Sequence, residues 1–173
     1  MRIRNLDLAT VVAAAAFIAA PGTAAPVPAS IDADGRALVL VPLTLVKIDD
    51  LNFGTVVRSS APGTVTINPS TGARTLAGGV TGVTSDPGHR AYFAGAGTPS
   101  QQVLLAISPP VALASASGDT IPVTGLTLDG PPIRTIDPIT RAFYVGVGGT
   151  IQVAADQPEG VYNADFWLTA IYQ

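Results

Sequence analysis

The chain offers few side chains that could carry out catalysis. His89 is its single histidine and cysteine is absent, so Cys–His chemistry and multi-histidine metal sites are excluded. A Ser–His–Asp set would have to be built around His89, which follows the turn-like sequence Asp-Pro-Gly at residues 86–88. A histidine in such a turn is more often a solvated loop residue than a general base. We therefore expect a protein without enzyme activity.

Two short motifs resemble binding loops but are incomplete. D-A-D-G at residues 32–35 resembles the start of a calcium loop, but the third oxygen ligand and the distal glutamate are missing. G-V-G-G-T at residues 146–150 resembles a phosphate loop, but no helical pattern follows whose amino end would hold a phosphate. We expect a polar linker at the first motif and a bulge or sharp bend between two strands at the second. The sequence predicts no metal and no cofactor.

The charge of the chain argues against a nucleic-acid binder. Its formal net charge is −3, and Lys47 is its only lysine. The arginines are scattered along the chain, whereas a surface that follows phosphates needs clustered basic residues.

The amino end predicts a secretory signal peptide. Two arginines precede an uncharged apolar run at residues 8–20, and a Pro-Gly break then leads into small residues. We assign residues 1–24 to the signal, with cleavage before Ala25; cuts after Ala25 or Ala29 are alternatives. The expected location is the periplasm and then the cell surface or the exterior. The mature chain has no further apolar run long enough to cross a membrane.

The sequence of the mature chain predicts an all-β domain. Apolar residues alternate with a period of two, and clusters of Pro, Gly, Asn and Asp separate the alternating segments. Many short strands divided in this way favour an immunoglobulin-like antiparallel β-sandwich, which we assign to residues 36–173. Pro42 suggests an edge position or a bulge in the first strand. The expected strands are residues 37–46, 55–58, 64–67, 90–94, 102–108, 123–128, 142–147, 150–154 and 161–172.

The last of these strands has the clearest alternation. One set of its side chains should face the core, whereas the opposite set starts polar and becomes apolar at Trp167 and Ile171. Such a strand is either central in its sheet or covered by another chain, and the alternation alone leaves both explanations open. The residues expected to face the core are Tyr162, Ala164, Phe166, Leu168, Ala170 and Tyr172.

Several motifs occur in a characteristic order. They are L-N-F-G-T at residues 51–55, T-G-A-R at 71–74, V-G-V-G-G-T-I-Q-V at 145–153, and G-V-Y at 160–162 followed by Phe166, Leu168 and Tyr172. This order resembles a family of secreted proteobacterial domains of unknown function. It is also similar in layout to the spore-coat-protein-U-like pilins of archaic chaperone–usher systems, which share the early L-x-F-G motif and the terminal G-x-Y strand.

The pilin resemblance implies donor-strand complementation, in which a sandwich that lacks one strand receives it from another chain. The implied partners are copies of the protein or related subunits, a periplasmic chaperone and an outer-membrane usher. Within the extension at residues 25–35, alternating small or apolar residues form a candidate donor strand, but a flexible linker fits equally well. The candidate donor residues are Val27, Ala29, Ile31 and Ala33, and the candidate C-terminal pairing strand carries Tyr162, Phe166, Leu168 and Tyr172.

Two functions therefore remain open. The first is a fimbrial or pilus-type structural or adhesive subunit assembled by strand exchange, because an open head-to-tail contact builds a fibre. The alternative is a monomeric secreted or surface-attached module that binds a ligand through loops such as residues 109–120 or 130–140.

The signal assignment has a direct test. When the full-length chain is expressed in a Gram-negative host, the protein should appear in the periplasm or outside the cell, with an amino end near Ala25. Amino-terminal sequencing or intact mass of the fractionated protein checks this. An uncut form that retains Met1 and stays in the cytoplasm would contradict the assignment.

Overall fold

Ten β-strands form the secondary structure of residues 31–173, the part of the chain that the computed structural model describes. All pairings are antiparallel, so the all-β, antiparallel fold class is confirmed. No helix long and apolar enough to cross a membrane occurs among these residues. The signal assigned to residues 1–24 lies outside them. The strands are β1 (Thr44–Asp49), β2 (Val56–Ile67), β3 (Arg74–Gly82), β4 (Ala91–Ala96), β5 (Gln102–Ser108), β6 (Ala112–Ala114), β7 (Thr120–Leu128), β8 (Ile133–Thr135), β9 (Ala142–Val153) and β10 (Trp167–Tyr172).

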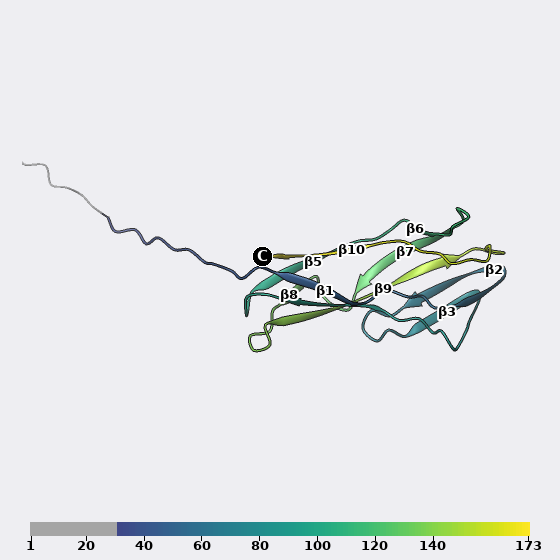
Figure 1. The fold of residues 1–173 in the computed structure, drawn as a ribbon, viewed down its shortest axis with the longest axis horizontal. Helices are drawn as coiled ribbons and strands as arrows, with labels where there is room; N and C mark the ends of the chain where they lie inside the picture. The colour runs from purple at the N-terminus through teal and green to yellow at the C-terminus, as the bar shows by residue number, and fades with distance from the viewer. Residues whose placement is uncertain (1–30) are drawn as a thin grey trace, which may run out of the picture. The chain divides into compact units, whose positions relative to one another are not determined.

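The strands form two sheets. The larger one has the order β1-β4-β9-β2-β3, with β7 paired to β9 and β6 paired to β7. The smaller one has the order β10-β5-β8. Figure 1 shows the C-terminal segment, in yellow, running along the domain and ending at the same end as β5 and β8.

The central strand is β9, which pairs with β4 at its start and with β2 and β7 further along. Because side chains alternate between the two faces of a strand, every second residue of β9 faces the interior. All residues of this interior row are buried. They are Phe143, Val145, Val147, Gly149, Ile151 and Val153.

The apolar interior consists of two clusters that share this face of β9. The first lies between β4, β5 and β9 and includes Phe93, Leu105 and Val145. The second lies between β2, β3, β7 and β9 and includes Val65 and Ile151. Buried branched and aromatic side chains of this size contribute about 1.5–3 kcal/mol each, so the two clusters are the main source of stability.

The first strand begins later than its alternation predicts. Residues 31–43 lie in no strand, and β1 starts only at Thr44. Pro42 lacks the N–H that a ladder needs, which separates the preceding apolar residues from β1. The backbone of Val41 is instead held by side chains: its N–H donates to Thr98 Oγ1 at 2.8 Å, and its carbonyl accepts from the Tyr172 hydroxyl at 2.8 Å. The compact unit accordingly starts at Leu38.

Other strand boundaries also differ from those expected. The two short strands expected between residues 55 and 67 are one bulged strand, β2, and the two expected between 142 and 154 are one strand, β9. The strands β3, β6 and β8 were not expected. The sequence of β3 contains three glycines, which conceal its alternation, and β6 and β8 have only three residues each.

The glycines of β9 do not form the bulge or sharp bend that we expected. The strand continues through them, and neither Gly146 nor Gly148 has a positive φ. A Cβ on Gly148 would overlap the carbonyl oxygen of Ile67, and a Cβ on Gly146 would overlap that of Pro69. After β2 the chain therefore crosses directly over the outer face of β9, and glycine is needed because the two backbones approach so closely.

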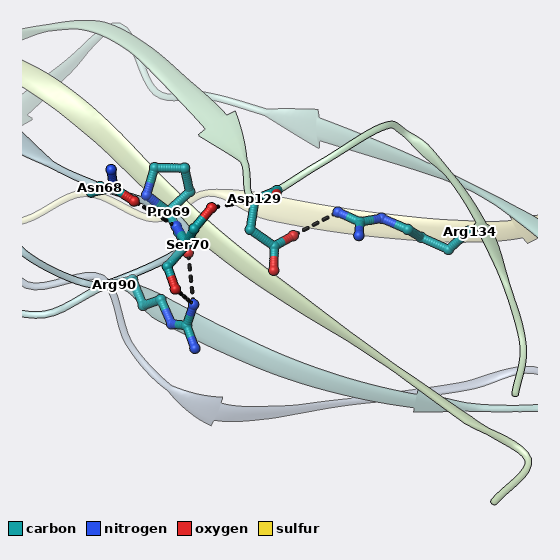
Figure 2. Close-up of polar contacts among 6 residues, drawn as sticks. All are labelled: Asn68, Pro69, Ser70, Arg90, Asp129 and Arg134. Atoms are coloured by element: carbon teal, nitrogen blue, oxygen red, sulfur yellow. Dashed lines mark hydrogen bonds and ion pairs between the residues drawn. The ribbon is translucent and has the colours of Figure 1, made fainter.

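The crossing segment is held by arginine and by a turn. The Arg90 guanidinium donates to the carbonyls of Pro69 and Ser70, and the Ser70 hydroxyl donates to the carbonyl of Asp129 at 3.4 Å. Asp129 in turn pairs with Arg134 at 2.6 Å, where both side chains are mostly buried. Figure 2 shows these contacts linking the turn after β2 to the start of β4 and the end of β7.

The close approach over β9 gives a matched pair of substitutions. Gly148→Ala should lower the free energy of unfolding by about 1–3 kcal/mol, because the added methyl group forces two backbones apart. The control is Gly125→Ala, since a Cβ there meets nothing within 4 Å. Chemical denaturation measures both changes. Equal losses of unfolding free energy at the two positions would contradict the explanation that Gly148 is needed for the close approach of the two backbones.

Candidate binding groove

A long groove opens along one side of the domain. Its first wall is the continuous segment 47–58, which includes the end of β1 and the start of β2. Its second wall is the continuous segment 157–166, which leads into β10. The space between the walls is about 1350 Å³. A space of this size leaves room for a further chain.

The floor of the groove is made of core side chains. Ile151 and Val153 of β9 belong to the second cluster, and Phe93 of β4 belongs to the first, yet all three line the groove. All three are nevertheless at most 8% exposed, so the groove reaches down to the core but leaves these side chains buried. The remaining floor residues are Leu113, Ile121, Val123 and Leu126.

The L-N-F-G-T motif forms the middle of the first wall. Asn52 pairs with His89 through two backbone hydrogen bonds of 2.8 and 2.9 Å, and its side-chain oxygen accepts from the N–H of Gly54 at 2.7 Å. Gly54 has a φ of 74°, which favours glycine, and a Cβ there would overlap Arg74 and the backbone of Asp86. The motif thus builds a tight turn against the segment 86–89.

Arg74 fastens this wall to the rest of the domain. From the start of β3 its Nη1 donates to the carbonyls of Phe53, Thr55 and Asp86 at 3.0–3.3 Å, and its Nη2 donates to Val83 at 2.9 Å. A planar guanidinium with several N–H groups can satisfy four carbonyls at once, which a lysine cannot do in this geometry. The sequence-based interpretation of T-G-A-R as a motif gave no role to this arginine.

The second wall is held by a buried amide and a tyrosine. Gln157 is only 6% exposed, and its Nε2 donates to the carbonyl of Thr120 at 3.2 Å and to the Tyr162 hydroxyl at 3.0 Å. The same hydroxyl donates to the carbonyl of Pro158 at 2.7 Å. Asn163 adds a two-bond backbone bridge to Ala114 of β6. The sequence marked this stretch only as a turn, because nothing in its pattern reveals a buried glutamine.

β1, whose end lines the first wall, and β10, which follows the second wall in the sequence, are edge strands. β10 pairs only with β5, and β1 pairs only with β4, among the described strands. Each therefore presents a row of backbone N–H and C=O groups without a ladder partner. Such an edge is a template for another strand.

Of the candidate C-terminal pairing residues, Leu168 and Tyr172 lie in β10 whereas Tyr162 and Phe166 precede it, and the expected alternation is confirmed over β10. Phe166, Leu168 and Tyr172 pack on the first cluster, with the Phe166 ring edge-on to Phe93 at 6.2 Å. Tyr162 packs on the second cluster. The strand itself is shorter than expected, since β10 begins at Trp167.

The opposite face of β10 is open as well. Trp167 is 67% exposed and Ile171 is 53% exposed, although β10 is an edge strand and not the central one that we considered. Ile171 pairs with Leu104 of β5, which pairs with Ile133 of β8, so an apolar row crosses the small sheet.

The candidate donor residues are only partly within the described chain. Val27 and Ala29 lie outside it. Ile31 is 94% exposed and Ala33 is exposed, and neither belongs to a strand. Among residues 31–173, Ile31 therefore has almost no packing contact that would be lost if it moved into a groove.

Among residues 31–173 the groups considered for chemistry do not converge. His89 lies on the groove, but its Nδ1 contacts only the carbonyl of Arg90 at 3.3 Å, and the Asp86 carboxylate accepts from the Thr55 hydroxyl at 2.7 Å. No group of three or more His, Cys, Asp or Glu side chains could hold a metal within that range, which includes Asp32 and Asp34.

A second, smaller pocket of about 300 Å³ lies between β2, β7 and β9. It is lined mainly by threonines, of which Thr66 and Thr150 bond each other at 2.9 Å and Thr124 bonds the Thr150 carbonyl at 3.0 Å. These hydroxyls already have partners within the sheet, so the groove is the stronger candidate site.

The fastening of the first wall leads to a mutational test. Arg74→Met should lower the free energy of unfolding by roughly 2–4 kcal/mol, because four carbonyls lose their donors. Arg58→Met is the control, since its pair with Asp156 is exposed and is worth at most about 1 kcal/mol. Denaturant titration of both variants provides the comparison, and equal losses would refute the assignment of a fastening role to Arg74.

A comparison with protein-family models matches the same part of the chain that forms the ten strands. The family model described as "Domain of unknown function (DUF4402)" matches residues 43–172, which covers β1 to β10 and both groove walls. The comparisons with curated proteins and with solved structures gave no match. Since the match spans most of the chain, the protein belongs to this DUF4402 family.

Proposed function

We propose that this protein is an exported, non-catalytic subunit that accepts an extended β-strand in its groove and thereby assembles into a fimbrial or pilus-type surface structure. The observation that carries the proposal is the groove itself, whose floor includes the half-buried apolar side chains Leu113, Val123 and Leu126. A folded domain gains by covering such partly exposed apolar surface, at about 25 cal/mol per Å².

The hydrogen-bonding groups beside the groove favour a strand over a small molecule. A chain added between two open edges gains main-chain hydrogen bonds for affinity, and its alternating side chains enter the floor for specificity. β1, whose last residues line the groove, is such an edge strand. A small ligand would leave most of them unused.

Exchange of a strand between chains would also account for assembly. An extended segment of one subunit that enters the groove of the next subunit repeats without closure and builds a fibre.

The alternative, a monomeric secreted or surface-attached ligand-binding module, has one observation in its favour. Val111 and Ile139 are 90% and 88% exposed and lie in the two loop regions considered for recognition, 109–120 and 130–140. Part of each region is nevertheless committed to a strand, β6 or β8, which limits the loop length available for binding.

Deletion and rescue test the proposal. A mature chain that lacks residues 25–35 should fold but form no higher-order species, because no donor is present. Adding the 25–35 peptide at about a hundredfold excess over its Kd should raise the melting temperature by roughly 5–10 °C. Ile31→Asp in the peptide should weaken the rescue more than Ser30→Asp, since Ile31 is the larger apolar side chain of the donor face.

Two outcomes would overturn the proposal. Unchanged oligomers after the deletion, measured by size-exclusion chromatography with light scattering, would show that residues 25–35 are a linker. Equal effects of the two aspartate substitutions would show that the peptide does not bind as an alternating strand.

A further inference from the structure

The net charge of the domain is concentrated at the groove. Residues 38–173 contain six basic and nine acidic side chains. Two of the basic and five of the acidic ones line the groove, so the rest of the domain carries four of each and is balanced. The whole excess of negative charge therefore lies where an incoming strand would bind. The five acidic residues are Asp49, Asp50, Asp86, Glu159 and Asp165.

The two cations of the groove are already engaged. Lys47 pairs with Asp50 at 2.6 Å, and Arg58 pairs with Asp156 at 3.1 Å. Among residues 31–173 no ion pair involves Asp49, Glu159 or Asp165, and all three are exposed. Asp49 lies on one wall and Glu159 and Asp165 on the other, so a strand between them would pass unneutralised carboxylates on both sides.

The extension of this chain does not match that charge. Residues 25–40 contain two acidic side chains, Asp32 and Asp34, and one basic side chain, Arg36. Placing this segment in the groove would bring further carboxylates to an acidic surface, and like charges at an interface oppose association.

We propose that the preferred occupant of the groove is an extended segment of a different protein, in which lysine or arginine residues flank the alternating apolar side chains. The inference rests on the proposed strand-accepting function and names the partner by its charge. Basic residues on both sides of the inserted strand would pair with Asp49, Glu159 and Asp165 and would also steer the encounter.

The salt dependence of the affinity distinguishes charge-based recognition from binding by apolar contacts alone. Exposed charges interact over about 10 Å at 0.1 M ionic strength and over much shorter distances at higher salt. The charge-dependent part of the affinity should therefore fall as salt rises, whereas the contribution of apolar burial should remain.

Two peptides that differ at two charged positions test the inference on the mature chain that begins at Ala25. One is the native sequence of residues 25–40, and the other carries Asp32→Lys and Asp34→Lys; a scrambled version of the lysine peptide is the control. By fluorescence anisotropy at about 20 mM salt, the lysine peptide should bind about tenfold more tightly than the native one. This advantage should nearly vanish at about 500 mM salt.

Substitutions in the groove complete the test. Glu159→Gln with Asp165→Asn should remove most of the lysine advantage, whereas Asp119→Asn, outside the groove, should preserve it. Tighter binding of the native peptide would identify a second copy of this chain as the occupant. That result would overturn the basic-partner inference but not the strand-accepting function. Equal binding of the scrambled peptide would overturn it as non-specific charge. Binding of neither ordered peptide would overturn the strand-accepting function as well.

Discussion

The apolar interior of a β-sandwich must be covered on every side, and the backbone groups at its sheet edges need partners. Both requirements are met along β9, whose interior face supports the two clusters and whose edges pair with β4, β2 and β7. Both are met less fully between segments 47–58 and 157–166, where half-buried apolar side chains such as Val123 and Leu126 line the groove and β1 is an edge strand. The proposed function follows from this one incomplete side.

The groove is nevertheless a built feature with fixed walls. Arg74 ties one wall to the start of β3 through four carbonyls, and Gln157 with Tyr162 ties the other to β7. Loops without such contacts would close over exposed apolar side chains. Because the walls are held apart, the groove is preorganised for an added strand and loses less conformational entropy on binding.

The sequence predicted the features that depend on local pattern. The all-β class, the sandwich, and the inward face of the last strand follow from alternation and turn residues, and Phe166, Leu168 and Tyr172 lie where alternation puts them. The late start of β1 depends on Pro42 together with Thr98 and Tyr172, distant residues that replace a ladder. The role of Gly148 depends on a neighbouring backbone that only the folded chain brings close. The groove likewise could not be predicted from the sequence, because its walls are about one hundred residues apart along the chain.

Hydrogen exchange of the backbone amides tests the central claim most directly, by comparing the isolated domain with the assembled protein. If a strand fills the groove on assembly, amides of segments 47–58 and 157–166 and of the open edge of β10 should exchange quickly in the isolated domain and slowly in the assembly. Amides of β9 should be protected in both states. Slow exchange of both wall segments in the isolated domain, without change on assembly, would contradict the account.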